Sequence, residues 1–209
     1  MRKQKFEFLL DEIKLQTNFA IISINHFNVT WSDLFNKDID NDERTTLTYE
    51  FWYYLQNYVI SLGNISKMLF ATKNFQESNI EYGKRLNDRK IFTRTLNVKQ
   101  NSILRDKKMR NLLEHIDENL EKFSSKSPGI IINRNIGPSN SIRIGDEFLF
   151  ENDEDNLRNF ITDRKELILF GKRLNVKETF KEVLELRNQI VEIEKKYKKG
   201  DLNHIFNED

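Results

Sequence analysis

Glycine and proline are scarce in this chain, which has 7 Gly and 2 Pro among 209 residues. A turn-rich β fold needs both residue types in quantity, whereas long helices exclude them. The scarcity therefore predicts long uninterrupted helices over most of the chain. Hydrophobic residues make up 38% of the sequence, including 16 Phe and 6 Tyr, which argues against general disorder and predicts a well-buried core.

Helices are expected in four N-terminal segments, at residues 3–27, 47–72, 80–96 and 102–123, of which the third is basic and polar. We expect the first helix to be packed on more than one side near residues 19–27. The second is apolar and aromatic nearly all round, which is typical of a helix buried between partners, and Gly63 in its middle indicates a close approach by another element. The segment 28–44 is predicted to be a polar connector, and Thr45 or Thr46 to cap the second helix.

The residue pattern of the sequence changes after residues 124–129, Ser-Ser-Lys-Ser-Pro-Gly. Short apolar runs at residues 130–132, 148–150, 157–162 and 167–170 predict antiparallel strands, with a tight turn at 163–166. A last helix is expected over residues 176–198, followed by a loose tail from residue 200 to residue 209. The sequence thus predicts a mainly α fold: a helical bundle over residues 1–124, and an appendage of short strands and a long helix over residues 125–209.

Charge and cysteine content exclude several classes of site. The chain has no Cys, which rules out a disulfide framework and a thiolate zinc site. With 34 basic and 33 acidic residues, a net charge of +1 gives no bulk electrostatic footprint for nucleic acid. Any RNA contact must come from a local patch, and the basic third helix offers Arg85, Arg89 and Arg94. The N-terminus lacks the pattern of a signal peptide, and no apolar stretch approaches the roughly 18 residues of a membrane span, so we expect a cytoplasmic chain without membrane contact.

The fourth predicted helix carries a group of polar residues on one side. At about 100° per residue, one arc collects an apolar stripe: Met109, Leu112, Leu113, Ile116, Leu120 and Phe123. The opposite side collects Asn111, His115, Glu118 and Asn119, with Arg110 and Glu114 beside them. His115 is therefore expected to point away from the core.

The spacing of these residues suggests specific contacts. Asn111 and His115 are four apart and could form a hydrogen bond, which would fix the tautomer of the imidazole. Glu114 is four after Arg110 and could hold its guanidinium by charge. A histidine beside an arginine, without a metal, suits cleavage of a phosphodiester by the neighbouring 2′-hydroxyl. The imidazole moves protons near neutral pH and the guanidinium stabilises charge on phosphorus. Two-fold symmetry would supply the second imidazole, and DNA lacks the attacking hydroxyl.

Two stretches of the sequence resemble the HEPN superfamily. The first is Arg110-Asn111-Leu112-Leu113-Glu114-His115-Ile116-Asp117-Glu118-Asn119-Leu120, and the second is the upstream Asn64-Ile65-Ser66-Lys67. The resemblance covers roughly residues 47–123. It implies a HEPN-like helical bundle, a homodimer that faces two motifs across a groove, and metal-independent endoribonuclease activity without a cofactor. It also implies a toxin–antitoxin or phage-defence setting, in which an antitoxin, or a guide or regulatory RNA or protein, is a possible partner.

The same resemblance implies roles for individual residues. Arg110 and His115 would be catalytic, and Asn111 would orient the imidazole. Supporting roles would fall to Glu114, Glu118, Asn64 and Lys67.

Three alternatives remain at this stage. A HEPN-like partner without catalysis, serving for dimerisation or for RNA or nucleotide binding in a larger complex, would keep the bundle but not need His115. A metal enzyme could use His115 and Glu118 as an i,i+3 ligand pair, although no second pair is visible and His26 and His204 lie in unrelated contexts. A purely structural helical protein would use its aromatic residues as core only.

Overall fold

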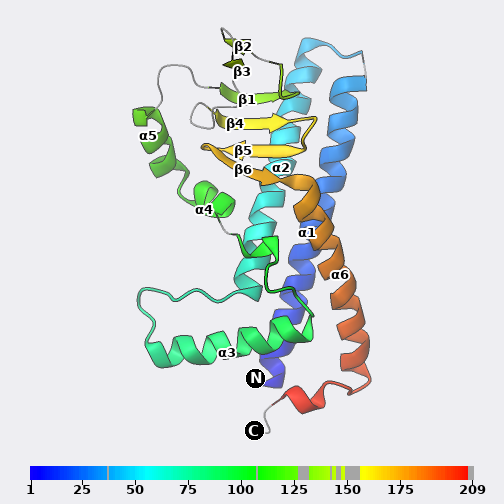
Figure 1. Cartoon of the computed structure of the whole chain (residues 1–209). Coiled ribbons are helices and arrows are strands. Elements are labelled where there is room, and N and C mark those ends of the chain that lie inside the picture. The colour runs from blue at the N-terminus through cyan, green and yellow to red at the C-terminus, as the bar shows by residue number, and fades with distance from the viewer. Residues whose placement is uncertain are drawn as a thin grey trace. The chain divides into compact units, whose positions relative to one another are not determined.

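The computed structural model describes residues 1–36, 38–106, 108–126, 132–141, 143–144, 147–148 and 156–206 (Figure 1). Over these residues the chain is mainly helical, with a small four-stranded sheet and a long final helix. The mainly α fold class with C-terminal strands is thereby confirmed. No helix in these ranges combines the length and the apolar content that crossing a membrane requires.

The chain divides into two compact units. Unit 1 comprises Met1–Asp106 and Lys181–Asp209, and unit 2 comprises Lys107–Phe180. The sequence places its division near residue 124 instead, because the composition changes there. The difference arises because the segment that carries the predicted motif groups with the strands, whereas most of the last helix groups with the first three helices.

Two long helices, α1 (Lys3–Asn36) and α2 (Asn41–Leu69), make the most extensive contact within unit 1. Helix α1 runs well beyond the predicted end at residue 27, since Thr30 and Leu34 continue its buried face. Asp40 caps α2 by accepting a hydrogen bond from the backbone N–H of Glu43 at 2.8 Å. The predicted cap at Thr45 or Thr46 is wrong, because both hydroxyls bond back to carbonyls inside the helix.

Neither long helix is covered on all sides. The shared core includes Phe6, Ile13 and Ala20 from α1 and Phe51, Leu55 and Tyr58 from α2, all of them fully buried. Gly63 is buried in the C-terminal third of α2. Phe19 and Ile22 are about half exposed, and Tyr49 and Tyr53 more so. The prediction that α2 is buried nearly all round is therefore wrong. Residues 19–27 of α1 do bury Ala20, Ile24 and Phe27, but among the described residues each helix keeps an apolar face open.

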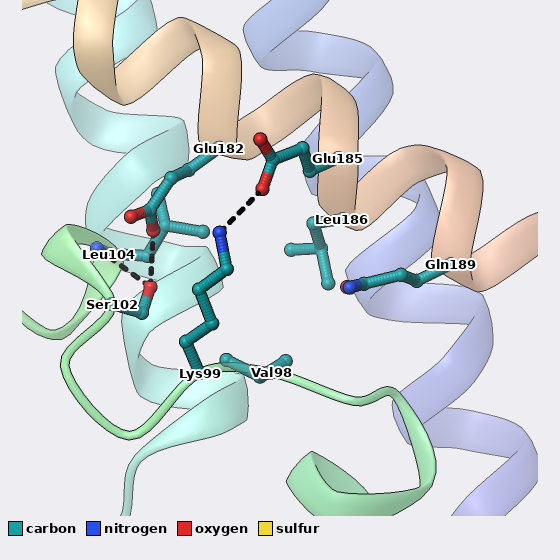
Figure 2. Close-up of a pocket in the computed structure, with 8 residues that line it drawn as sticks. All are labelled: Val98, Lys99, Ser102, Leu104, Glu182, Glu185, Leu186 and Gln189. Atoms are coloured by element: carbon teal, nitrogen blue, oxygen red, sulfur yellow. Dashed lines mark hydrogen bonds and ion pairs between the residues drawn. The ribbon is translucent and has the colours of Figure 1, made fainter.

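The remaining elements of unit 1 are α3 (Asn79–Thr95), the short 3-10 helix η1 (Ile103–Arg105), α6 (Val176–Lys198) from Lys181 onward, and η4 (Asn203–Ile205). Figure 2 shows how the loop before η1 is tied to α6: Ser102 donates to Glu182 at 2.5 Å and Lys99 pairs with Glu185 at 3.1 Å. The predicted loose tail is wrong for residues 200–206, because the Phe206 ring packs on Phe6 with centroids 5.4 Å apart. Residues 207–209 lie outside the described residues.

Unit 2 contains α4 (Lys108–Glu114), α5 (Ile116–Lys126) and the strands. The strands are β1 (Ile132–Gly137), β2 (Arg143–Ile144), β3 (Glu147–Phe148), β4 (Asn156–Ile161), β5 (Glu166–Leu169) and β6 (Lys172–Asn175). The larger sheet has the order β1-β4-β5-β6, and β2 pairs with β3. The predicted turn between β4 and β5 is confirmed by their antiparallel pairing. The expectation of antiparallel strands throughout is wrong, because β1 runs parallel to β4. Strands β2 and β6 were not predicted, and residues 130–131 and 149–150 of the predicted runs lie outside the described residues.

Candidate active site

The predicted fourth helix is broken at His115. Helix α4 ends at Glu114 and α5 begins at Ile116, so the continuous helix expected over residues 102–123 is wrong. Backbone bonds carry on around the break: His115 donates to the Asn111 carbonyl at 3.1 Å, and Asn119 donates to the His115 carbonyl at 2.9 Å. The two helical segments thus remain connected through a local kink.

The Asn119 side chain bonds to backbone carbonyls at the kink. Its amide nitrogen donates to the carbonyl of His115 at 2.7 Å and to the carbonyl of Leu112 at 3.2 Å. A side chain that inserts into the backbone ladder of a helix is a common cause of such a bend. The sequence placed Asn119 on the same face as His115 but gave it no role. The spacing of four residues was a signal for this contact, although it does not distinguish a backbone from a side-chain partner.

His115 lies open to solvent, as its place on the helical wheel predicts. Its side chain is 62% exposed, and Nδ1 lies 3.7 Å from a carboxylate oxygen of Glu118. The other oxygen of Glu118 lies 3.5 Å from Lys122. A protonated imidazole would therefore have an acidic neighbour, and a neutral one would leave its ring nitrogens accessible.

The predicted side-chain hydrogen bond from Asn111 to His115 is wrong. Asn111 is exposed, and within the described parts of the chain its side chain makes no hydrogen bond to the imidazole. Its link to His115 is through the backbone carbonyl alone. The groups that act on the orientation of His115 are instead Glu118, through the ring, and Asn119, through the backbone.

Arg110 is paired as predicted but lies in a different environment. Its guanidinium contacts the Glu114 carboxylate, four residues on. The Arg110 side chain is only 10% exposed, and among the described residues its Nη1 is buried without a hydrogen-bond partner. The apolar stripe expected on this helix is less buried, since of its six residues only Met109 is buried and Leu120 is exposed. The guanidinium is therefore not presented to solvent beside His115.

The upstream pair Asn64 and Lys67 belongs to α2, in unit 1, whereas Arg110 and His115 belong to unit 2. The Asn64 side-chain amide donates to the carbonyl oxygen of the Gln16 side chain at 3.1 Å, which ties α2 to α1. Lys67 is exposed in the last turn of α2. Asn64 thus has a structural contact of its own, and the supporting role of both residues stays a prediction.

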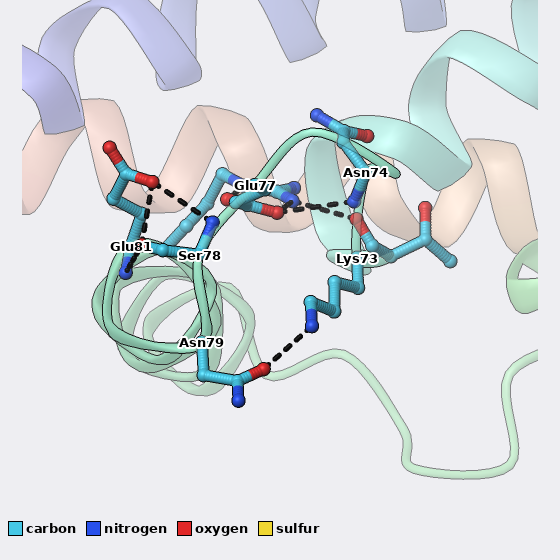
Figure 3. Close-up of polar contacts among 8 residues, drawn as sticks. Lys73, Asn74, Glu77, Ser78, Asn79 and Glu81 are labelled. Atoms are coloured by element: carbon cyan, nitrogen blue, oxygen red, sulfur yellow. Dashed lines mark hydrogen bonds and ion pairs between the residues drawn. The ribbon is translucent and has the colours of Figure 1, made fainter.

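The three arginines of α3 differ in availability. Arg85 is engaged at the start of the helix, where Nε donates to Glu77 at 2.8 Å and a terminal nitrogen donates to the Thr72 carbonyl at 2.7 Å. The hydrogen bond from Arg85 lowers the pKa of Glu77. Figure 3 shows this region, in which Ser78 and Glu81 also form a reciprocal capping box. Arg85 is thus part of the architecture of this turn.

Arg89 and Arg94 differ from Arg85 in their hydrogen bonding and in their exposure to solvent. Burial, and then the neighbouring Arg85, lower the pKa of Arg89, and among the described residues its Nε and Nη1 have no hydrogen-bond partner. Arg94 is exposed. Of the three predicted RNA contacts, Arg94 is therefore the one that the structure leaves open to solvent.

Two hollows lie apart from Arg110, Asn111 and His115, although Asn64 of the upstream motif lines the second of them. One, beside Lys99 and Ser102, measures about 20 Å³ and has room for about one water molecule (Figure 2). The other is a groove of about 390 Å³ between α1 and α2. Within the described ranges, no group of three His, Asp or Glu side chains is arranged to hold a metal ion.

Comparison with known proteins adds no further constraint. No family model, curated protein or solved structure matches the chain.

Proposed function

We propose that the chain is a metal-independent endoribonuclease of HEPN type that acts as a homodimer, in a toxin or phage-defence setting. The observation that supports it is the accessible imidazole of His115, held at a helix break by Asn119 and faced by Glu118. This histidine lies in the Arg-x4-His pattern on which the resemblance rests. An exposed histidine with an acidic neighbour is suited to proton transfer near neutral pH.

The reaction would proceed by attack of the 2′-hydroxyl of RNA on the adjacent phosphorus. The imidazole of His115 in one copy takes the proton of the hydroxyl as the new P–O bond forms. The bond from phosphorus to the 5′ oxygen breaks, and the imidazolium of the second copy gives its proton to the leaving oxygen. The products are a 2′,3′-cyclic phosphate and a free 5′-hydroxyl, so no water or metal enters this step.

The place of Arg110 in this reaction follows from its burial. In its present contact with Glu114 the guanidinium stabilises the helix that bears His115, and so acts as a positioning group. Stabilising the charge on phosphorus would require Arg110 to leave Glu114 and reach solvent when RNA binds. The same burial favours the second candidate function, a HEPN-like partner that binds RNA or nucleotides without cleaving.

An RNA-cleavage assay with added chelator separates these functions. We expect wild type to produce cyclic-phosphate ends and His115→Ala to lose about 10²–10⁴-fold in rate, the usual contribution of a proton-transfer group. His204→Ala is a matched control, since His204 is also exposed but lies in η4. Growth arrest by wild type but not by His115→Ala, on expression in a bacterium, would support the toxin setting.

Two results would count against cleavage. Binding of RNA without cleavage by the wild type, unchanged in His115→Ala, would favour the non-catalytic partner. Cleavage that stops on addition of chelator would instead point to a metal enzyme.

A further inference from the structure

Helix α1 has a second apolar face, which is exposed in the part of the chain that the structure describes. It is formed by Phe8, Leu15, Phe19, Ile22 and Val29, which are between 43% and 65% exposed. Phe8, Leu15, Ile22 and Val29 follow one another at intervals of seven residues, and Phe19 lies four after Leu15. Residues seven apart return to within about 20° on a helix, so these side chains form one line along about six turns. We call this line the exposed stripe.

The exposed stripe lies on the side of α1 away from its core. Ile13, Ala20 and Phe27 are also seven apart and are buried. At 100° per residue they lie about 120° to 160° around the helix from the exposed stripe. An ordinary surface helix has one apolar face, which it buries against its own domain. A helix with two apolar faces can bury one against its own core and the other against a further partner.

The neighbouring helix extends this face. Tyr49, Tyr53 and Ile60 of α2 are exposed, and they also lie within a narrow arc of their helix. Between the helices runs the groove of about 390 Å³, walled by Phe19 and Ile22 on one side and by Tyr53 and Ile60 on the other. Figure 1 shows α1 and α2 running alongside each other through unit 1, and the residues that line the groove link the exposed positions of the two helices.

We propose that this α1–α2 face is the interface at which a second copy of the chain binds. From the exposed fractions of its eight apolar side chains, the accessible area of the face is on the order of 800 Å² per copy. Each partner contributes about this area to a protein–protein interface of standard size. A monomer rarely exposes a continuous apolar surface larger than a few hundred Å². The face is therefore large enough to sustain a dimer without contributions from elsewhere.

The chemistry of the groove fits a like partner better than a charged one. All ten residues that line it are uncharged, and its polar members include the amides of Gln16, Asn57 and Asn64. Asn64 and Gln16 bond each other within the chain, but an amide has two donors and an acceptor, so Asn57 and the remaining capacity of Asn64 could meet the same groups of a second copy across a two-fold axis. In such a dimer, the exposed side chains of Phe19 and Ile22 of one copy would pack into the groove beside Tyr53 of the other copy. This inference stands on the face itself and holds whether or not the chain cleaves RNA.

The test is the mass of the full chain in solution, measured by light scattering on a size-exclusion column. We expect wild type to be a dimer, and Ile22→Glu to weaken association at least 100-fold and run as a monomer. Phe75→Glu is the matched control, because Phe75 is fully exposed but lies in the loop before α3, and it should remain dimeric. Unchanged far-ultraviolet circular dichroism would show that each variant is folded.

Tyr53→Glu provides a second variant on the other helix and should have the same effect as Ile22→Glu. A wild type that is monomeric at every concentration would overturn the proposal and leave the face to a different partner. A dimer that persists in both variants would overturn it too, because the copies would then meet through another surface.

Discussion

Replacing Glu114 by Gln tests how strongly the structure depends on the buried charge of Arg110. The Arg110 side chain is 10% exposed and that of Glu114 is 41% exposed. Removing one partner of a fully buried ion pair costs about 3–5 kcal/mol, because the other charge is left uncompensated. Glu114 is two-fifths exposed and a glutamine can still accept a hydrogen bond, so we expect a loss of about 1–2 kcal/mol in the free energy of unfolding.

The double variant Arg110→Met, Glu114→Gln checks the cause of that loss. Methionine fills a similar volume without a charge, and replacing a buried ion pair by apolar groups is often neutral. We therefore expect the double variant to be more stable than Glu114→Gln alone. The assay is urea unfolding followed by circular dichroism. Glu118→Gln serves as the control and should stay within about 0.5 kcal/mol of wild type, because Glu118 is 59% exposed and its ion pair with Lys122 is solvated.

Two results would refute this reasoning. One is a Glu114→Gln variant as stable as wild type, which would mean that Arg110 is compensated by other groups. The other is a double variant whose loss of unfolding free energy equals the sum of the losses of Arg110→Met and Glu114→Gln, which would mean that the two residues act independently.

Three further predictions concern other parts of the chain. Asn119→Leu removes both amide donors at the helix break, so the Cα chemical shift of His115 should move in a nuclear magnetic resonance spectrum and stability should fall by about 1 kcal/mol. Burial and a neighbouring glutamate raise the pKa of Tyr197 to about 12. The stabilisation from the Tyr197 hydroxyl is therefore complete below a pH of about 10, the pKa in the unfolded chain, and is lost as the pH rises toward 12. Unfolding experiments at a series of pH values should show this decline in wild type, and Tyr197→Phe should abolish it. Asp40→Ala should cost about 1 kcal/mol by removing the cap of α2, whereas Thr46→Ala, on the site favoured by the sequence, should cost less in the same urea assay.

Elements with a clear local pattern could be predicted closely from the sequence. Helix α6 begins and ends where its apolar stripe does, at Val176 and Lys198. Helix α1 was predicted too short because residues 28–36 are mostly polar, although Thr30 and Leu34 still bury their side chains. In that segment tertiary packing outweighs local composition.

The sheet shows where local patterns are insufficient. Strand β6 was missed because the turn before it uses Phe170 and Gly171, both with positive φ. Two positive φ values are typical of the tight turn that joins hairpin strands, but that turn favours Asn or Asp where this chain has Phe. The parallel pairing of β1 with β4 joins segments more than 20 residues apart. No periodicity within either strand reports on such a partner.

Only part of the candidate site can be predicted from the sequence, because local spacing does not report on contacts with distant segments. A helical wheel places His115 toward solvent correctly, because that inference depends only on the side of the helix opposite Met109. It does not place Arg110, because the burial of this side chain depends on contacts with other segments, which a wheel of one helix does not contain.

The burial of Arg110 also decides how substitutions in the motif must be interpreted. A substitution at His115 changes an exposed side chain, so a loss of cleavage there would report on chemistry with stability unchanged. A substitution at Arg110 disturbs a buried charge, so a loss of activity could arise from unfolding alone. Equal losses of activity at the two positions would therefore not show equal roles. The comparison that separates them is Arg110→Met with Arg110→Met, Glu114→Gln: if the double variant is as stable as wild type and still inactive, Arg110 acts on the reaction and not only on the fold.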